Sequence, residues 1–269
     1  MSRLLVFGPG YTAGRIAAAA EARGWHVARI GRAAFAEAGR EIAAATHILS
    51  SVPPEHEADA VLAHYRDALG RSGAWLGYLS STGVYGDTRG AWVDESASTG
   101  TGRRTARTEA DRDWLSLGAR VFRLPGIYGP GRSPLDRLRD GTAYRVASDQ
   151  LFSRIHVDDI VAAVLSAFDA PAGPYNIADD EPATQAEVTT YAARLLGCEP
   201  PPLKQVAELP APARAFHMEH RRIANGRAKR LLGWSPRFPT YRAGLRALSA
   251  TTSPVSVNAP PTAASTDQR

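Results

Sequence analysis

The sequence has very little cysteine: Cys198 is the only one among 269 residues. With one cysteine the chain cannot form an internal disulfide, and a cysteine-rich metal site is excluded. The seven histidines do not compensate, because His217 and His220 lack the i, i+4 spacing of a two-histidine zinc helix. We therefore expect no metal site, and we expect these two histidines to lie at the surface.

Long hydrophobic runs are also absent. No stretch of about 18 apolar residues could span a bilayer, and the short apolar stretch 4–7 is interrupted at once by Gly8. This beginning is typical of a first strand and not of a secretion signal. We therefore expect a cytoplasmic protein without a membrane partner.

Lysine is scarce, because Lys204 and Lys229 are the only lysines among 32 basic residues. The formal net charge of +5 would suit an acidic partner, but the arginines are scattered along the chain and form no stripe. We therefore predict no nucleic-acid partner. The expected partner is a small-molecule substrate, bound by a monomer or a homodimer.

Apolar runs typical of strands alternate with amphipathic helical patterns in the first half of the sequence. This alternation predicts βαβ units and a parallel sheet. Strands are predicted at 3–7, 25–30, 46–52, 74–80 and 119–124. Helices are predicted between them at 12–23, 36–44, 55–71 and 105–117.

The pattern becomes less regular after residue 125, where prolines and glycines mark loops. Helices are predicted there at 134–139, 158–169, 184–196 and 225–232. We therefore predict an α/β fold, a Rossmann-type doubly wound parallel sheet with a small C-terminal α/β lobe. The domain is expected over 1–250, with the lobe mainly from about 130–250, and the Ser/Thr/Pro-rich segment 251–269 is expected to be a disordered tail.

A glycine-rich turn follows the first strand and opens the first helix. Gly8, Gly10 and Ala13 fit the G-x-G-x-x-(G/A) pattern of dinucleotide-binding folds. In that pattern the first glycine permits the tight turn, the second lets a diphosphate approach, and helix N-terminal amides face the phosphates. We predict cofactor contacts from Gly8, Gly10, Tyr11, Thr12 and Ala13. The alternative is a tight strand–helix turn without a ligand.

The end of the second strand selects between NAD and NADP, because an acid there bonds the ribose hydroxyls and an arginine accommodates a 2′-phosphate. The segment 26–32 contains no acid and ends at Arg32, which favours NADP, with NAD as the alternative. Arg32 could equally be one more solvated arginine. Further cofactor contacts are predicted from Ser51, Val52, Ser80, Arg107, Pro125 and Ile127.

Four downstream segments resemble one protein family, in the correct order. Residues 80–86 read S-S-T-G-V-Y-G, residues 123–131 read R-L-P-G-I-Y-G-P-G, residues 154–160 read R-I-H-V-D-D-I, and residues 175–178 read Y-N-I-A. These motifs resemble the extended short-chain dehydrogenase/reductase family of nucleotide-sugar epimerases, dehydratases and reductases. The short chain resembles an atypical, epimerase-like branch of that family. The resemblance covers most of residues 1–180 and implies a Rossmann fold that binds a nicotinamide cofactor.

In this family a Ser or Thr and a Tyr-x-x-x-Lys pair carry the chemistry. Ser81, with Thr82 as its neighbour, matches the Ser/Thr that hydrogen-bonds the reacting oxygen. The Tyr-x-x-x-Lys pair aligns with Arg103 and Arg107, so the catalytic tyrosine is missing. Arg107 can still hold the nicotinamide ribose. Arg103 cannot replace the tyrosine as a general base, because a guanidinium with a pKa above about 12 accepts no proton near pH 7.

Two other phenols, Tyr85 and Tyr128, lie within the resembling motifs. Either could take over proton transfer, and we name Tyr128 with Ser81, Thr82 and Arg107 as the candidate catalytic residues. The alternative is that both rings pack beneath the cofactor loop.

The resemblance implies hydride exchange on a nucleotide sugar or a similar polar carbonyl or hydroxyl metabolite. In that reaction Ser81 would orient the reacting oxygen. The missing tyrosine leaves a second possibility open, since fold does not determine function: a non-catalytic NADP(H)-binding sensor or regulatory protein.

Overall fold

A six-stranded parallel sheet forms the centre of the computed structural model, which describes residues 2–55, 58–102 and 105–251. Its strands, given in their spatial order, are β2 (His26–Ile30), β1 (Arg3–Phe7), β3 (His47–Ser50), β4 (Trp75–Ser81), β6 (Arg120–Leu124) and β11 (Gly173–Asn176). The chain adds β2 on one side of β1 and all later strands on the other. The carboxyl ends of β1 and β3 therefore form a topological switch point, where doubly wound folds bind their ligands.

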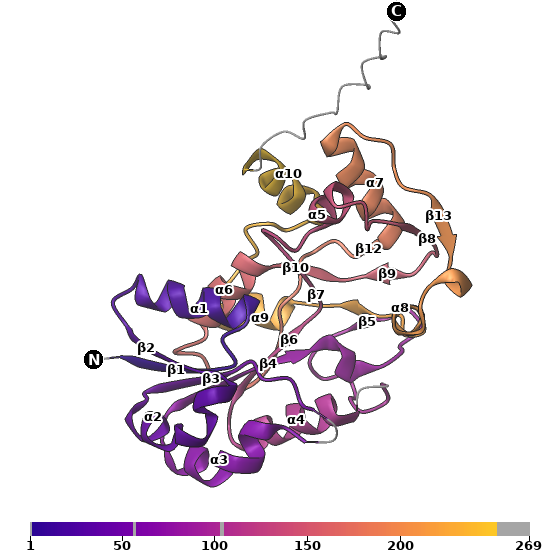
Figure 1. Ribbon diagram of the computed structural model, residues 1–269. Coiled ribbons are helices and arrows are strands. Elements are labelled where there is room, and N and C mark those ends of the chain that lie inside the picture. Colours follow the sequence, from indigo (N-terminus) through magenta and orange to yellow (C-terminus); the bar gives the residue numbers. More distant parts are fainter. Residues whose placement is uncertain (1, 56–57, 103–104, 252–269) are drawn as a thin grey trace, which may run out of the picture.

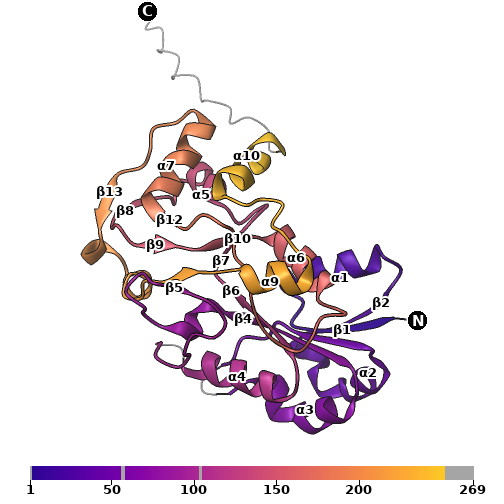
Figure 2. The same cartoon turned by 180° about the vertical axis from the view of Figure 1, so that it is seen from behind.

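Helices cover both faces of this sheet, which explains why its inner strands are apolar throughout. One face packs against α1 (Tyr11–Glu21), α6 (Val157–Ser166) and α9 (Gly226–Leu232). The other face packs against α2 (Gly39–Ala44), α3 (Ala60–Arg71) and α4 (Thr105–Ser116). Figures 1 and 2 show the two layers from opposite sides. The predicted α/β class and Rossmann-type sheet are confirmed.

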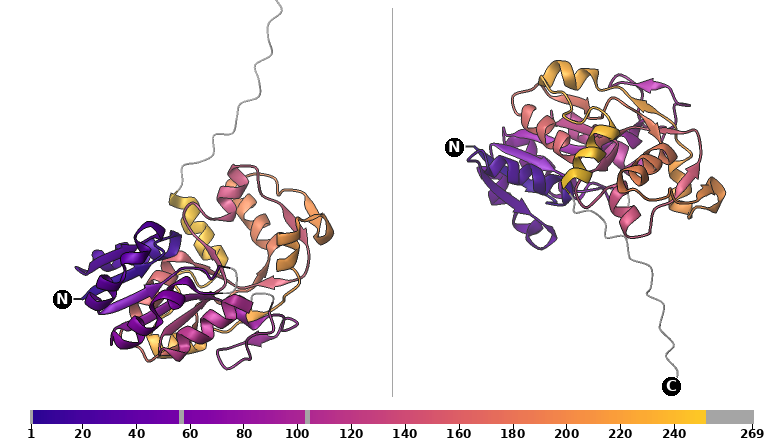
Figure 3. Two further views of the ribbon diagram at one scale, coloured as in Figure 1. Left: turned by 60° about the horizontal axis from the view of Figure 1, so that its bottom comes forward. Right: turned by 90° about the horizontal axis from the view of Figure 1, so that it is seen from above.

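A lobe lies beyond the carboxyl edge of the sheet and has its own apolar core. Its helices are α5 (Pro134–Arg139), α7 (Gln185–Leu196), α8 (Ala211–Phe216) and α10 (Tyr241–Thr251). Two-stranded ladders accompany them: β7 (Gly126–Tyr128) with β10 (Arg154–His156), β8 (Arg145–Ala147) with β13 (Leu203–Gln205), and β9 (Leu151–Phe152) with β12 (Ala183–Thr184). Both views in Figure 3 place the indigo strands and the orange lobe segments at opposite ends of the molecule.

A fourth ladder joins β5 (Trp92–Val93) to β14 (Arg222–Ile223), far apart in the sequence. It connects the loop after β4 to the segment that follows α8. This ladder therefore holds the turn after β4 against the lobe, and the candidate site lies where the two meet.

Most predicted elements are confirmed within a few residues, and three predictions need correction. The helix predicted from residue 55 begins at Ala60, because Asp59 caps it by accepting a hydrogen bond from the Leu62 amide at 3.0 Å. The helix predicted at 36–44 is divided into a 3-10 helix, Arg32–Glu37, and α2. Thr251 ends α10, which was not predicted, and 252–269 lie outside the described residues.

No helix in the described ranges has both the length and the apolar character needed to cross a membrane.

Candidate functional site

The glycine turn joins β1 to α1 at the carboxyl edge of the sheet. Gly8 has a φ of +70°, which favours glycine, and its amide donates a hydrogen bond of 2.9 Å to the Ile30 carbonyl at the end of β2. A Cβ on Gly8 would lie 3.0 Å from Val52 Cγ2, just beyond β3. The structure therefore brings the predicted residues Gly8, Gly10, Ser51 and Val52 together where β1, β2 and β3 end.

The first amides of α1 are available as donors for an anion. Gly10 is the N-cap and offers no side-chain hydrogen bond to the helix, so the amides of Tyr11, Thr12 and Ala13 depend on other acceptors. Above them, the Tyr11 hydroxyl donates to the Pro130 carbonyl at 3.1 Å, and burial raises the pKa of Tyr11. The turn fits a cofactor diphosphate, because the space that a Cβ on Gly10 would fill beside these donors is open, with the Gly8 carbonyl oxygen 4.0 Å away as its nearest described neighbour.

Arg32 follows β2 directly and lies at the surface. Its side chain is 93% exposed, and its guanidinium forms an ion pair of 2.7 Å with Glu55, in the loop after β3. Strand β2 ends without an acid. Arg32, paired with the exposed Glu55, thus occupies the position that contacts the adenosine ribose in dinucleotide-binding Rossmann folds.

A cavity of about 770 Å³ opens at the carboxyl ends of β4 and β6 and extends to the lobe. Six of the predicted site residues line it: Ser80, Ser81, Thr82, Arg107, Pro125 and Ile127. The described lining contains one carboxylate, Glu219, and five arginines: Arg107, Arg132, Arg137, Arg154 and Arg221. The cavity is therefore cationic and suits a polar or anionic ligand.

Ser81 ends β4 at the edge of this cavity. Its Oγ accepts a hydrogen bond from the Gly83 amide at 3.1 Å, so it caps the 3-10 helix η2 (Thr82–Tyr85). That bond uses the oxygen and leaves the hydroxyl hydrogen for another acceptor. Thr82 is buried next to it. Ser81 is consequently held in place and able to donate to a ligand oxygen.

Arg107 enters the same cavity from α4. Its Nη1 donates to the Tyr78 hydroxyl at 2.8 Å and lies 3.4 Å from the Leu79 carbonyl oxygen, so one side of the guanidinium is fixed on β4. Burial raises the pKa of Tyr78 well above its ordinary value, which keeps this phenol neutral. Arg103, the residue aligned with the missing tyrosine, lies outside the described residues.

A buried polar network supports the turn from below. Arg123 forms an ion pair with Asp111 at 2.7 Å, and Ser80 Oγ donates to the same carboxylate at 2.7 Å. Arg123 Nη1 also donates to the Tyr85 hydroxyl at 2.9 Å, and that hydroxyl donates to Asn176 Oδ1 at 2.8 Å. Burial raises the pKa of Tyr85. Tyr85 is therefore a fixed member of this network and is not placed for proton transfer to a ligand in the cavity.

Tyr128 is turned toward the lobe and does not join Ser81. Its hydroxyl has no hydrogen-bond partner among the described residues, and a Cβ on Gly244 of α10 would lie 2.1 Å from it. Tyr128 lines a second cavity of about 550 Å³, and burial raises its pKa. The catalytic role of Tyr128 therefore stays a prediction, with packing as the alternative: the ring lines a second cavity, which shares Gly126 and Ile127 with the Ser81 cavity.

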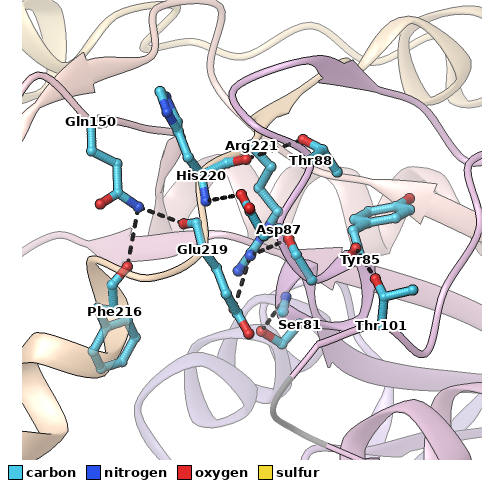
Figure 4. Close-up of polar contacts among 12 residues, drawn as sticks. Ser81, Tyr85, Asp87, Thr88, Thr101, Gln150, Phe216, Glu219, His220 and Arg221 are labelled. Atoms are coloured by element: carbon cyan, nitrogen blue, oxygen red, sulfur yellow. Dashed lines mark hydrogen bonds and ion pairs between the residues drawn. The ribbon is translucent and has the colours of Figure 1, made fainter.

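The lobe contributes residues that the sequence did not reveal (Figure 4). In the segment 216–221, Arg221 Nη1 donates to the Gly86 carbonyl at 2.7 Å and pairs with Glu219 at 2.9 Å. Gln150 Nε2 donates to the Phe216 carbonyl at 3.1 Å. No local motif marks these residues, because Gly86 is 135 residues from Arg221 and Phe216 is 66 residues from Gln150. Only the topology brings them to the Ser81 turn.

The two histidines of this segment, predicted at the surface, are half-buried. His217 lines the main cavity, and His220 Nε2 accepts a hydrogen bond from the Leu151 amide at 3.1 Å. Within the described ranges, no group of three or more His, Cys, Asp or Glu side chains is placed to hold a metal ion.

Comparison with solved structures identifies the relatives of this chain. A functionally unknown conserved protein from Silicibacter pomeroyi is 38% identical, with a TM-score of 0.83 over 93% of this chain and 99% of that one. This chain belongs to the same family as that protein. No family model matches the sequence.

Solved structures of a dehydratase and of an epimerase family protein share the fold of this chain. The dTDP-glucose 4,6-dehydratase of Bacillus anthracis, solved with NAD, has a TM-score of 0.73 at 15% identity over 93% of this chain and 96% of that one. The human epimerase family protein SDR39U1, solved with NADPH, has a TM-score of 0.72 at 19% identity over 93% and 100%.

Curated relatives match only part of this chain. The 3-diazoavenalumate denitrifying reductase of a Streptomyces species is 38% identical over 161 residues, which are 52% of this chain and 52% of that protein. Protein YeeZ of Escherichia coli is 35% identical over 133 residues, which are 46% and 47% of the two chains. The chain therefore spans about half the length of the curated relatives that it matches.

Proposed function

We propose that this protein binds NADP(H), with NAD as the alternative, and exchanges hydride with a polar carbonyl or hydroxyl metabolite. When bound, the nicotinamide supplies the hydride acceptor or donor. The amides of residues 11–13 would hold the diphosphate, Arg32 would hold a 2′-phosphate, and Arg107 would hold the nicotinamide ribose.

The convergence of Ser81, Arg107 and the loop 125–127 on one cavity carries this proposal. These residues come from β4, from α4 and from the segment that leads from β6 into β7, and they meet at the same edge of the sheet as the glycine turn. Ser81 would donate its hydroxyl hydrogen to the reacting oxygen and stabilise charge on it. A nucleotide sugar fits the five arginines of the lining, as does any similar metabolite with an acidic group.

A second function, non-catalytic NADP(H) sensing, is favoured by one observation. Neither phenol considered as a replacement for the missing tyrosine faces a ligand in the Ser81 cavity: Tyr85 is bound to Arg123 and Asn176, and Tyr128 packs in the lobe. A protein of this kind would bind the cofactor tightly and leave it unreacted.

Calorimetry followed by turnover assays distinguishes these functions. We expect NADP or NADPH to bind the purified protein, and we expect bound NADPH to be oxidised by at least one member of a panel of sugar nucleotides and ketones. Tight binding without oxidation by any member would support the sensor. Absence of binding by all four nicotinamide dinucleotides at millimolar concentration would contradict both functions.

A further inference from the structure

One carboxylate of the lobe faces the Ser81 cavity, and the proposed chemistry has not yet used it. Glu219 lines the cavity together with Ser81 and Arg107, and its side chain is only 9% exposed. Figure 4 shows the side chain extending from the segment 216–221 toward the turn that carries Ser81. A carboxylate and a serine hydroxyl thus line the same cavity.

The structure fixes the Glu219 carboxylate relative to that turn. Arg221 Nη1 lies 2.9 Å from Glu219 Oε2 and donates at 2.7 Å to the carbonyl of Gly86, the residue that closes η2. Gln150 Nε2 also donates to the main-chain carbonyl of Glu219. The Arg221 bridge therefore ties the carboxylate to the turn that runs from Ser81 to Gly86, and Figure 4 shows the carboxylate directed toward Ser81. An acid–base group needs this kind of restraint to act at a defined substrate atom.

We propose that Glu219 is the general acid–base residue of this protein and performs the proton transfer that the missing tyrosine cannot. This assignment rests on the proposed hydride-exchange function. In the oxidation direction, the carbinol C–H bond breaks and its hydrogen leaves as hydride to the oxidised nicotinamide. The O–H proton passes to a Glu219 carboxylate oxygen, and the O–H bonding electrons form the C=O bond. In the reduction direction, the Glu219 carboxyl returns this proton to the oxygen, while Ser81 hydrogen-bonds the same atom.

Among the described lining residues, His217 and Tyr144 are the side chains besides Glu219 and the arginines that could exchange a proton, and their contacts place them elsewhere on the wall. The His217 ring packs edge-on against Phe152 of β9, with 5.3 Å between ring centroids, and burial lowers its pKa. Tyr144 lies beside β8, with the Lys204 ammonium 5.4 Å from its ring centre. Neither of these contacts involves the Ser81 turn, whereas Glu219 is linked to that turn through Arg221.

The test compares Glu219→Gln with Glu219→Asp, His217→Gln and Tyr144→Phe. Hydride transfer from bound NADPH is measured in a single turnover across a range of pH, with the panel member that the wild-type protein reduces fastest. We expect Glu219→Gln to slow hydride transfer about 100-fold or more. The limb of the pH profile in which the wild-type rate changes as Glu219 titrates should disappear in this variant. NADPH affinity, measured by calorimetry, should stay unchanged. Glu219→Asp should retain the limb at a reduced rate. Glu199→Gln, an exposed carboxylate outside the cavity, is the matched control and should behave as wild type.

Infrared difference spectroscopy gives a readout that does not depend on turnover. The wild-type protein should show a carboxylic-acid C=O band that appears on acidification, is missing in Glu219→Gln, and titrates with the same midpoint as the rate limb. If Glu219→Gln does not fold, Glu219→Asp and this band decide the question.

The remaining outcomes contradict the proposal that Glu219 is the acid–base residue, and they show whether the proposed function fails with it. A near-wild-type rate for Glu219→Gln would refute the role of Glu219 while the proposed function stands. The same would follow if Tyr144→Phe or His217→Gln lost the limb instead. If the wild-type protein transfers hydride to no panel member, the proposed function fails and the assignment fails with it.

Discussion

At the scale of single residues, Arg32 tests which cofactor the groove prefers. Its exposed guanidinium is held by Glu55 alone among the described ion pairs, so an incoming phosphate has to displace one solvated carboxylate. We expect Arg32→Ala to weaken NADP binding about 10- to 100-fold, the value of a charge-assisted hydrogen bond, and to leave NAD binding unchanged. Calorimetry with both dinucleotides measures this difference directly.

Two further variants sharpen that measurement. Glu55→Gln releases the Arg32 guanidinium and should tighten NADP binding, whereas Arg40→Ala removes an exposed arginine of α2 and should change neither affinity. Equal losses of NADP and NAD affinity in Arg32→Ala would show that Arg32 is a solvated arginine without a role in cofactor choice.

Single residues also show where sequence reasoning reached its limit. Gly8, Ser81 and Arg107 were predictable because each lies in a local motif at a strand end or a helix start. Glu219 and Arg221 lie in no such motif. Their place in the site depends on the hydrogen bond from Arg221 to Gly86 and on the cavity between sheet and lobe, and both form only in the folded chain. The cavity that Tyr128 lines was not predictable, because a motif locates a residue in the chain and does not state which way its ring points.

At the scale of elements, the long helices and the strands of the central sheet were predictable from periodicity, because each buries a continuous apolar face. The paired strands of the lobe were not, as two- or three-residue segments such as β5 and β14 become strands only through partners distant in the sequence. Helix α10 is amphipathic, but its apolar face is buried only in the folded chain, where it packs against α7 and Tyr128.

The β1–α1 turn is the element whose geometry limits cofactor approach, and a matched glycine pair tests it. Gly8→Ala places a Cβ 3.0 Å from Val52 Cγ2 at a φ of +70°, whereas Gly24→Ala meets no atom within 4 Å at a φ of +79°. Both variants should lose about 1 kcal/mol of unfolding free energy from the left-handed backbone. Only Gly8→Ala should also lose cofactor binding. Urea denaturation and calorimetry report the two quantities, and retained binding in Gly8→Ala would argue against a diphosphate at this turn.

At the scale of the whole molecule, a buried carboxyl where sheet and lobe meet makes stability depend on pH. Asp179 follows β11, is 1% exposed, and has no hydrogen-bond partner for either side-chain oxygen among the described residues. Burial raises its pKa to about 8, although Arg154, whose carbonyl accepts a hydrogen bond from the Asp179 amide, opposes the shift through its charge. Because Asp179 binds its proton more tightly in the folded chain, its contribution to stability is complete below about pH 4 and is lost as pH rises through about 8.

We therefore expect the free energy of unfolding to fall between about pH 4 and about pH 8 and to level off above that range. Asp179→Asn, which keeps the shape and cannot ionise, should flatten this fall and stabilise the protein by about 1 to 3 kcal/mol at the alkaline end. Asp67→Asn, an exposed carboxylate of α3, should retain the wild-type profile. Some slope should persist near pH 6 in every variant, because burial also raises the pKa of Asp159 to about 6. An Asp179→Asn profile parallel to wild type would mean that the Asp179 carboxyl ionises in the native state without cost, which requires a donor that the described residues do not supply.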